Sequence, residues 1–352
     1  MRSNYVLCES EGKFDNGWVF YNYLINNRTD VKAFFYQTPV FDSFWGELKK
    51  YVWLMWHIKL FKYAFTSYSI IDLKKYNPNA VSIHMGHSVP FKYAYKSLVG
   101  VFSQARIDYI TFSENVSNVM ELKYNMSDVS KKYLIPHPRI DLFKAKEKII
   151  DSFRNMIGWK NGEVVITTML TFRRNENQIT SLNLLPFDID FNKLNDALNN
   201  NGIRLVIKLH HMLDEAVSNE NNYSNIVFLK NVDAIKNGFE ATSIMACSDA
   251  IVSDYSSSWI DYLFLNKPIA FYIGDYDDYK SNDDGNGFVF QNPLDLMPGA
   301  MFSSGDELIK LLPHLIKNDK YFDKRKKMCR FFFGVDSLPD SACSILEKKI
   351  IN

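Results

Sequence analysis

Two loops of this sequence carry histidines that could take part in acid–base chemistry. The first contains His84, Gly86 and His87 behind an apolar run, and the second has His210 behind the apolar run 204–209. An imidazole titrates near neutral pH, so either loop could supply a general base that takes a proton from a hydroxyl group. A histidine that only closes its loop is the alternative. His84 and His87 could also bind a metal, but a pair three residues apart without a third ligand makes a poor site.

A third loop is rich in serine. It follows the apolar run 250–253 and consists of Asp254, Tyr255, Ser256, Ser257 and Ser258. A helix is expected to begin directly after it, and the free N–H groups of a first helical turn attract anions. Together with the hydroxyl groups they could hold a phosphate or diphosphate. Simple capping of the helix by serine is the alternative.

Cationic side chains lie in further loops and could also hold a phosphate. Arg139 belongs to a proline-rich turn, Arg173 follows Thr171 just beyond an apolar run, and Lys92 follows the first histidine loop. Arginine binds phosphate oxygens through two parallel N–H groups. Ordinary salt bridges at the surface are the alternative for these residues.

The elements that must position these loops alternate between strand and helix. Strands are predicted over 5–8, 31–36, 68–73, 80–84, 109–112, 163–169, 204–209, 226–229, 250–253 and 268–272. Helices are predicted over 18–26, 114–124, 188–199, 240–247 and 259–265, and in the C-terminal third. This alternation indicates α/β structure with parallel sheets covered by helices on both faces. Ligands bind such sheets at the carboxyl ends of the strands, where the loops above lie.

The length of 352 residues is enough for two domains. We predict a Rossmann-like domain over 1–148, a second over 149–320 and a C-terminal helical segment over 321–352. Two such domains are expected to face each other across a cleft. Under this prediction His87 and His210 approach the cleft from opposite walls.

Composition limits the class of protein. Hydrophobic residues make up 47% and charged residues 23%, as in a folded globular protein. Because 41 basic side chains nearly balance 40 acidic ones, nucleic acid is not expected as a partner. The four cysteines form no zinc spacing and fit a reducing compartment. With neither a signal peptide nor an apolar run long enough to span a bilayer in view, the sequence predicts a cytoplasmic protein.

The segment 49–62 has two interpretations. It mixes tryptophan and other aromatic residues with four lysines, a composition typical of a helix that lies on anionic lipid. A helix that packs on a sheet and leaves its lysines in solvent is the alternative. Peripheral contact with the inner face of the cell membrane is therefore open.

Six segments, in this order, resemble motifs of the CDP-glycerol glycerophosphotransferase family, the polymerases and primases of teichoic acids and related capsules. They are Glu9–Asn16 (Glu-Ser-x-x-Gly), His87–Lys92 (His-Gly-Thr-Pro-Leu-Lys), Pro138–Asp141 (Pro-Arg-x-Asp), Thr171–Arg173 (Thr-Phe-Arg), Lys208–His210 and Asp254–Ser257 (Asp-Tyr-Ser-Ser). The sequence departs from the family at Ser88, where the family has glycine, and at Gly86, where it usually has tryptophan. His87, and not His84, is in register with this motif.

The resemblance implies a GT-B fold, an acceptor-side first domain and a second domain that binds the nucleotide. It implies that His87 and His210 are the catalytic pair and that Ser256 and Ser257 hold the diphosphate. Further contacts to the substrate are expected from Ser258, Asp254, Arg173, Thr171, Arg139 and Lys92.

The activity implied is transfer of glycerol phosphate, or another polyol phosphate, from CDP-glycerol or CDP-ribitol to a hydroxyl of a teichoic-acid-like or capsular polymer or a lipid-linked acceptor. In the hypothesis, His87 removes the acceptor proton, the β-phosphorus is attacked and CMP leaves, while His210, Arg173 and Arg139 stabilise the charge. No cofactor is predicted, and a divalent metal is left open. The alternatives are a GT-B glycosyltransferase that uses a nucleotide sugar and a non-catalytic nucleotide-binding scaffold.

Overall fold

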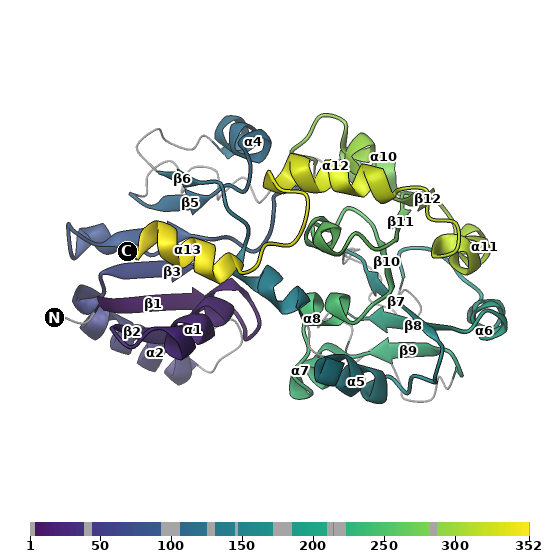
Figure 1. Cartoon of the computed structure of the whole chain (residues 1–352), viewed down its shortest axis with the longest axis horizontal. Helices are drawn as coiled ribbons and strands as arrows, with labels where there is room; N and C mark the ends of the chain where they lie inside the picture. Colours follow the sequence, from purple (N-terminus) through teal and green to yellow (C-terminus); the bar gives the residue numbers. More distant parts are fainter. Residues whose placement is uncertain are drawn as a thin grey trace. The chain divides into compact units, whose positions relative to one another are not determined.

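Two parallel sheets of six strands form the framework of the chain (Figure 1). The computed structural model describes residues 4–38, 44–92, 106–124, 131–144, 147–171, 185–209, 214, 223–281 and 287–351. The chain divides into two compact units. The first comprises Met1–Pro90, Ala94–Asp141 and Arg330–Asn352, and the second comprises Phe91–Tyr93 and Leu142–Cys329.

The sheet of the first unit has the strand order β2-β1-β3-β4-β5-β6. Its strands are β1 (Asn4–Ser10), β2 (Val31–Gln37), β3 (Tyr63–Thr66), β4 (Val81–His84), β5 (Asp108–Ile110) and β6 (Lys132–Tyr133). Its helices are α1 (Asn16–Asn27), α2 (Phe44–His57), α4 (Glu114–Tyr124) and α13 (Ala342–Ile350), and short 3-10 helices include η1 (Ile58–Leu60), η2 (Leu73–Lys75) and η3 (Pro138–Phe143).

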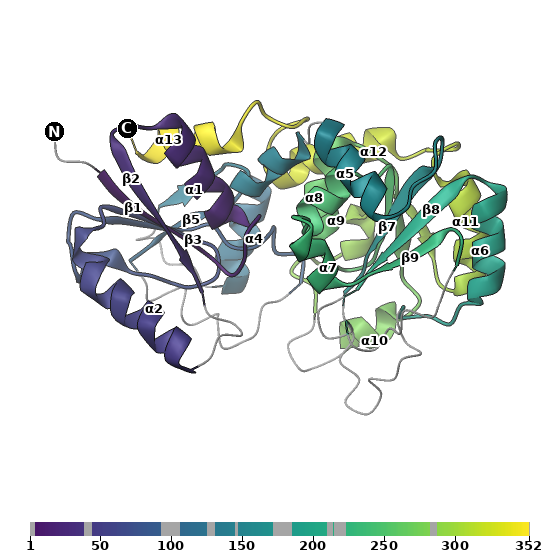
Figure 2. The ribbon, with the colours of Figure 1, turned by 90° about the horizontal axis from the view of Figure 1, so that it is seen from below.

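Alternation of side chains along the strands places helices on both faces of this sheet (Figure 2). Ala64 of β3 shares a buried cluster with Leu54 of α2. Its neighbour Phe65 points the other way and contacts Phe20 of α1, with ring centroids 4.7 Å apart. α1 is drawn close to β1 at Gly17, where an added Cβ would lie 2.2 Å from the backbone oxygen of Glu9.

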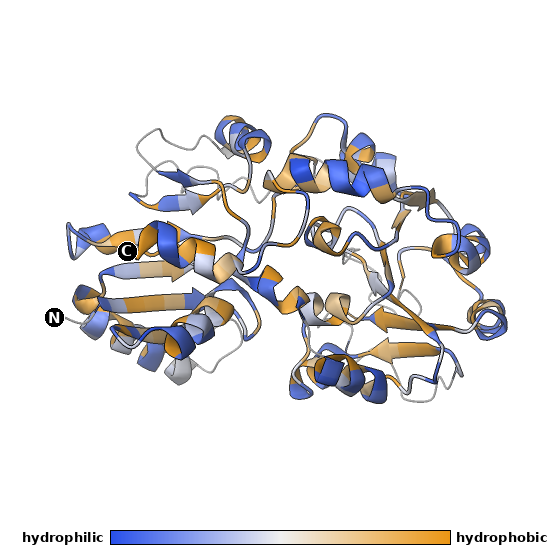
Figure 3. Cartoon of the chain, viewed as in Figure 1, coloured by the Kyte–Doolittle hydropathy of each residue, from blue (hydrophilic) through white to orange (hydrophobic). Residues whose placement is uncertain are grey.

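The sheet of the second unit has the order β12-β11-β10-β7-β8-β9. Its strands are β7 (Val164–Met169), β8 (Ile203–Lys208), β9 (Ile226–Leu229), β10 (Ala250–Ser253), β11 (Ile269–Tyr272) and β12 (Ala300–Phe302). Its helices are α5 (Glu147–Met156), α6 (Phe191–Asn200), α7 (Asn231–Lys236), α8 (Ala241–Ala246), α9 (Ser258–Tyr262), α10 (Tyr276–Ser281), α11 (Gly305–Leu315) and α12 (Phe322–Phe333), with 3-10 helices η5 (Leu263–Leu265) and η6 (Pro293–Leu296). Its strands are mostly hydrophobic, whereas helices such as α11 mix hydrophobic with hydrophilic residues (Figure 3).

The predicted α/β class with parallel sheets is confirmed, but one predicted strand is wrong. Residues 68–73 form no strand, and the third strand of the first sheet is Tyr63–Thr66. The apolar residues of 68–73 resemble a strand in sequence. Their N–H groups, however, partly serve a buried carboxylate, because Tyr68 and Ser69 both donate to Glu9.

The division into units follows the course of the chain. The predicted boundary after residue 148 lies inside α5, whereas the units change at Asp141. The predicted C-terminal segment 321–352 is shared: α12 passes from the second unit to the first, and α13 packs on α1 of the first unit. Glu347 of α13 accepts hydrogen bonds from Tyr23 and Arg28. In the described ranges, no helix combines the length and apolar character needed to cross a membrane.

Candidate active site

His87 lies in the loop that follows β4, at the carboxyl edge of the first sheet. Gly86 precedes it with a φ of +69°, a left-handed conformation that favours glycine. The backbone N–H of Met85 donates to the carbonyl oxygen of Thr66 at 2.6 Å, so the chain stays attached to β3 until it turns at Gly86. The His87 side chain is 45% exposed and accessible to a substrate.

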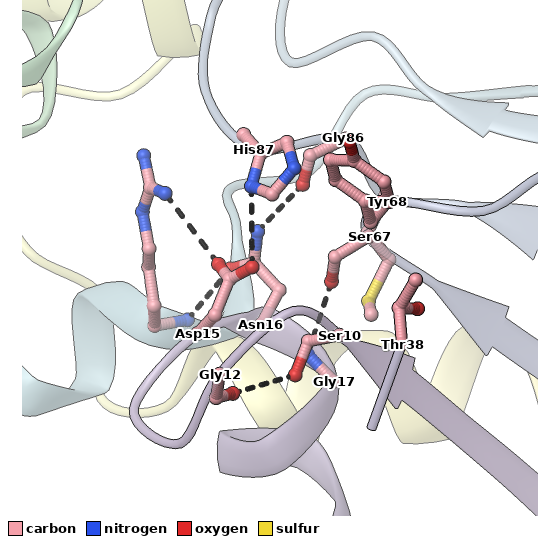
Figure 4. A network of polar contacts seen from close by, with 12 residues as sticks. Ser10, Gly12, Asp15, Asn16, Gly17, Thr38, Ser67, Tyr68, Gly86 and His87 are labelled. Carbon is pink, nitrogen blue, oxygen red and sulfur yellow. Dashed lines mark hydrogen bonds and ion pairs between the residues drawn. The ribbon is translucent and has the colours of Figure 1, made fainter. Parts of the chain in front are cut away.

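Asp15, at the end of the loop after β1, and Asn16, the first residue of α1, contact the His87 loop (Figure 4). Oδ2 of Asp15 lies 3.2 Å from Nδ1 of His87. The buried amide of Asn16 donates to the carbonyl oxygen of Gly86 at 2.8 Å and accepts from the backbone N–H of Arg139 at 3.1 Å. Neither residue was predicted from the sequence. The available signal was an Asp-Asn pair between a strand and a helix, inside the first family-like segment.

This grouping occupies the point where the strand order reverses. From β1 the chain builds outward to β2 on one side and to β3 and β4 on the other. The loops after β1 and β3 therefore leave the sheet in different directions, which is where open α/β sheets bind ligands. Asp15 follows β1, Ser67 follows β3 and His87 follows β4. The Ser67 hydroxyl accepts the N–H of Gly17 at 3.1 Å and joins the start of α1 to the loop after β3.

The buried side chain of Glu9 holds the loops at the carboxyl edge of this sheet through hydrogen bonds. Its carboxylate accepts the N–H groups of Ser67, Tyr68 and Ser69, and the hydroxyl of Thr38. Burial raises the pKa of Glu9, although these hydrogen bonds oppose the rise. The Tyr68 ring meets the His87 ring edge to face, with centroids 5.5 Å apart. Glu9 thus fixes the loop that restrains the imidazole.

The other two histidines near this edge are poorly suited to act as bases. Burial and the nearby His87 lower the pKa of His84 to about 4, and its Nδ1 lies 3.3 Å from the Thr66 hydroxyl. Burial lowers the pKa of His137 well below its ordinary value, and its Nε2 donates to the carbonyl oxygen of Met85 at 2.7 Å. Both rings are therefore neutral near pH 7, and His137 supports the backbone just before Gly86.

Arg139 and Asp141 of η3 have different partners. Nη1 of Arg139 lies 3.6 Å from Oδ1 of Asp15, so the guanidinium belongs to the His87 grouping. Asp141 accepts the backbone N–H groups of Ala342 and Cys343 at 2.7 and 3.1 Å and therefore caps α13. One residue of the Pro-Arg-x-Asp segment serves the site, and the other anchors the C-terminal helix.

In the second unit, Asp254 joins the loops after β7 and β10, which again flank the reversal of strand order. Its buried carboxylate accepts the N–H of Thr171 at 2.9 Å and the N–H of Ser256 at 2.8 Å. The Thr171 hydroxyl donates to Asp254 at 3.0 Å and accepts from Nζ of Lys92 at 3.1 Å. This geometry favours Asp254 as an organiser of the loops over a direct ligand of a diphosphate.

Lys92 belongs to the second unit although its sequence neighbours up to Pro90 belong to the first. The segment that carries it pairs with Phe288 and lies near the Tyr279 ring, whose centroid is 5.9 Å from Nζ. A cation is thus held beside Thr171 by contacts within this unit.

The serines after Asp254 are partly exposed at the start of the short helix α9. The hydroxyls of Ser256 and Ser258 lie 2.9 Å apart, and Ser257 is the N-cap residue with a helical φ of −69°. The side chain of Ser257 does not cap the helix. Simple capping by Ser257 therefore does not account for the cluster.

Two predicted site residues, His210 and Arg173, lie outside the described residues. Of the predicted set, His87 and Arg139 are brought together in the first unit, and Lys92, Thr171, Asp254 and Ser256–Ser258 in the second. Among the residues described, no three His, Cys, Asp or Glu side chains form a group that could hold a metal. That no cofactor is required stays a prediction.

The two six-stranded parallel units define an α/β protein of the GT-B class. Residues 13–338 match the CDP-Glycerol:Poly(glycerophosphate) glycerophosphotransferase family, and the chain belongs to this family. The fold is similar to that of a variant of the wall teichoic acid polymerase TagF, with a TM-score of 0.78 and 18% identity over 100% of this chain and 89% of that one.

Curated relatives are longer than this chain. It is 25% identical to the teichoic acid poly(ribitol-phosphate) polymerase of Bacillus spizizenii, over 100% of this chain and 56% of the relative. It is 22% identical to the teichoic acid poly(glycerol phosphate) polymerase of Staphylococcus epidermidis, over 68% of this chain and 31% of the relative. The chain thus spans about half or less of these relatives.

Proposed function

We propose that this protein transfers a polyol phosphate from a CDP-activated donor, CDP-glycerol or CDP-ribitol, to a hydroxyl group of a teichoic-acid-like polymer and releases CMP. Membership of the glycerophosphotransferase family over residues 13–338 is the observation that carries the proposal. The geometry of His87 supports the proposal, because this motif histidine is exposed and paired with a carboxylate, an arrangement suited to a general base.

In the proposed reaction, His87 takes the proton of the acceptor hydroxyl as its oxygen attacks the β-phosphorus. The bond from this phosphorus to the bridging oxygen breaks, and the oxygen leaves with CMP. Lys92 and Ser256–Ser258 are assigned to the diphosphate, with Asp254 and Thr171 holding their loops. Arg139, His210 and Arg173 are assigned to the charge that develops on the phosphoryl oxygens.

The test is product analysis by mass spectrometry with CDP-glycerol and CDP-ribitol and a polyol-phosphate-primed acceptor. We expect CMP and an acceptor longer by one or more polyol phosphate units. His87→Ala and His210→Ala should each lower turnover at least 1,000-fold, whereas His314→Ala, at an exposed position of α11, should not. Elongation only from nucleotide sugars, or near-normal CMP release by His87→Ala, would refute the proposal. Reactions with EDTA test whether a divalent metal takes part.

We further propose that α2 binds the anionic inner face of the cell membrane. The inward side of the helix contributes Leu54 to the core, while Trp45 and Trp56 on the outward side are 68% and 82% exposed. Val52 lies between them on the same helical stripe, and Lys49 is exposed beside it. Exposed tryptophans flanked by lysine fit the interface of an anionic bilayer.

Co-sedimentation with vesicles tests this contact. The unmodified protein should bind vesicles rich in phosphatidylglycerol more tightly than phosphatidylcholine vesicles. The double variant with Trp45→Ser and Trp56→Ser should bind these vesicles at least fivefold more weakly. Leu122→Ser, on α4 and 83% exposed, is the matched control and should bind normally. Equal binding by the double variant and the unmodified protein would contradict the proposal.

A further inference from the structure

The carboxylate of Asp15 lies between two cationic partners of the first unit. Its Oδ2 is 3.2 Å from Nδ1 of His87, and its Oδ1 is 3.6 Å from Nη1 of Arg139. The side chain is only 12% exposed, so these contacts are shielded from solvent. Figure 4 shows the carboxylate directed at the imidazole. No role for Asp15 follows from the family-like motifs.

The side chain of Asp15 does not cap α1 in the usual way. Asp15 is the N-cap residue, and its carbonyl oxygen accepts the N–H of Val19 at 2.9 Å. Aspartate at this position normally accepts an N–H of the first turn through its side chain, which stabilises the helix. Here the side chain makes no capping hydrogen bond and pairs with His87 instead.

The backbone of Phe14, just before Asp15, is strained. Its φ is +69°, a left-handed conformation that is unfavourable for a bulky residue. Its ring is held against Trp18, with centroids 4.7 Å apart. Such backbone strain persists where the surrounding structure enforces it, often at functional sites. The chain thus enters Asp15 through a strained backbone conformation.

The contact with Asp15 fixes the protonation of the imidazole. A carboxylate accepts a hydrogen bond, so the proton of neutral His87 must be on Nδ1. Nε2 is then unprotonated and able to accept a proton. The Tyr68 ring, edge to face with the imidazole, restrains its rotation.

Several charged groups act on His87. Partial burial of the ring lowers its pKa, but the hydrogen bond and negative charge of Asp15 outweigh this and raise the pKa above its ordinary value. Arg139 opposes the rise, and Glu11 adds to it. The neighbouring His84 and His137 rings have lowered pKa values and so stay neutral near pH 7. For Asp15 itself, burial favours the protonated form, yet His87 and Arg139 lower its pKa, so it is ionised.

We propose that Asp15 is the positioning residue of His87, holding the proton on Nδ1 and stabilising the imidazolium that forms when Nε2 takes the acceptor proton. This inference rests on the proposed function for its catalytic part. In the step concerned, the acceptor O–H bond breaks, its oxygen bonds to phosphorus, and its proton moves to Nε2. The Nδ1 proton stays between His87 and Asp15, and the CMP oxygen leaves with the electron pair of the broken P–O bond.

NMR of the unmodified protein labelled with ¹⁵N-histidine is the first test, with His87→Gln to assign the signals. We expect neutral His87 to carry its proton on Nδ1, the minor tautomer of free imidazole. A neutral His87 protonated on Nε2 would overturn the proposal. This measurement needs neither a variant of Asp15 nor turnover, so it also stands if the proposed transferase activity fails.

Kinetics of Asp15→Asn is the second test. We expect kcat to fall about 100-fold with the KM for the CDP-polyol within twofold, and the acid limb of the pH profile to move to lower pH as the NMR pKa of His87 falls. Asp15→Glu should recover at least a tenth of kcat, because the charge is kept. Asp30→Asn, the same change at the opposite edge of the sheet, should leave kcat and the pKa of His87 unchanged. A lower kcat with an unaltered tautomer and pKa of His87, or a near-normal kcat, would overturn the proposal.

Discussion

Replacing Asp141 by asparagine should loosen the C-terminal helix from the first unit. The carboxylate accepts the N–H groups of Ala342 and Cys343 at 2.7 and 3.1 Å and the hydroxyl of Ser341 at 2.9 Å. The change Asp141→Asn keeps one acceptor oxygen but removes the charge at the start of α13. Ser341 still caps the helix through the N–H of Ser344.

The expected cost follows from these contacts. A hydrogen bond to a charged group contributes about 1.5–3 kcal/mol, and a neutral one about 1 kcal/mol. A negative charge at a helix N-terminus contributes about 0.3–1 kcal/mol. Because the amide retains part of the bonding, we expect the free energy of opening α13 to fall by about 2 kcal/mol. This corresponds to roughly 30-fold faster amide exchange.

Hydrogen exchange measured by mass spectrometry over residues 342–350 is the assay. Asp336→Asn is the control, because Asp336 forms an exposed ion pair with Arg330 that contributes little to stability. Faster exchange in Asp141→Asn alone would support the anchoring role. Equal exchange of 342–350 in both variants would refute the reasoning.

Three further changes test other contacts. In His84→Gln, the free energy of unfolding should depend less on pH. In the unmodified protein, burial lowers the pKa of His84 to about 4, whereas in the unfolded chain the pKa is near 6.5. The unfolded chain therefore binds the proton first, and about 1–3 kcal/mol of stability is lost as the pH falls from 6.5 to 4. Urea unfolding at pH 7, 5.5 and 4.5 measures this, and an unchanged pH dependence would contradict it. Gly17→Ala should destabilise the fold by about 3 kcal/mol, since its Cβ would lie 2.2 Å from the backbone oxygen of Glu9; a melting temperature near that of the unmodified protein would count against this packing. Thr171→Val removes the hydroxyl between Lys92 and Asp254, so calorimetry should show CDP-glycerol bound about fivefold more weakly, and unaltered affinity would exclude this role.

The secondary structure was largely decided by local sequence. The predicted strands over 226–229 and 250–253 match β9 and β10, and the helix predicted over 114–124 matches α4. A short apolar run such as β10, which is fully buried in a parallel sheet, can be recognised without knowledge of its neighbours. The strand predicted over 68–73 was wrong because the N–H groups of Tyr68 and Ser69 donate to the buried carboxylate of Glu9, which is distant in the sequence.

The chain by itself determined the class of fold and the loops that carry His87 and the Asp254–Ser258 cluster, because strand periodicity and motif spacing are properties of short segments. Only the tertiary structure decided that Asp15 pairs with His87 across 72 positions and that Lys92 joins the second unit. The strand order places the loops after β1 and β4 at one edge of a sheet, and the return of the chain at Arg330 places α13 beside α1. These contacts depend on which distant segments become neighbours, and no local pattern encodes that choice.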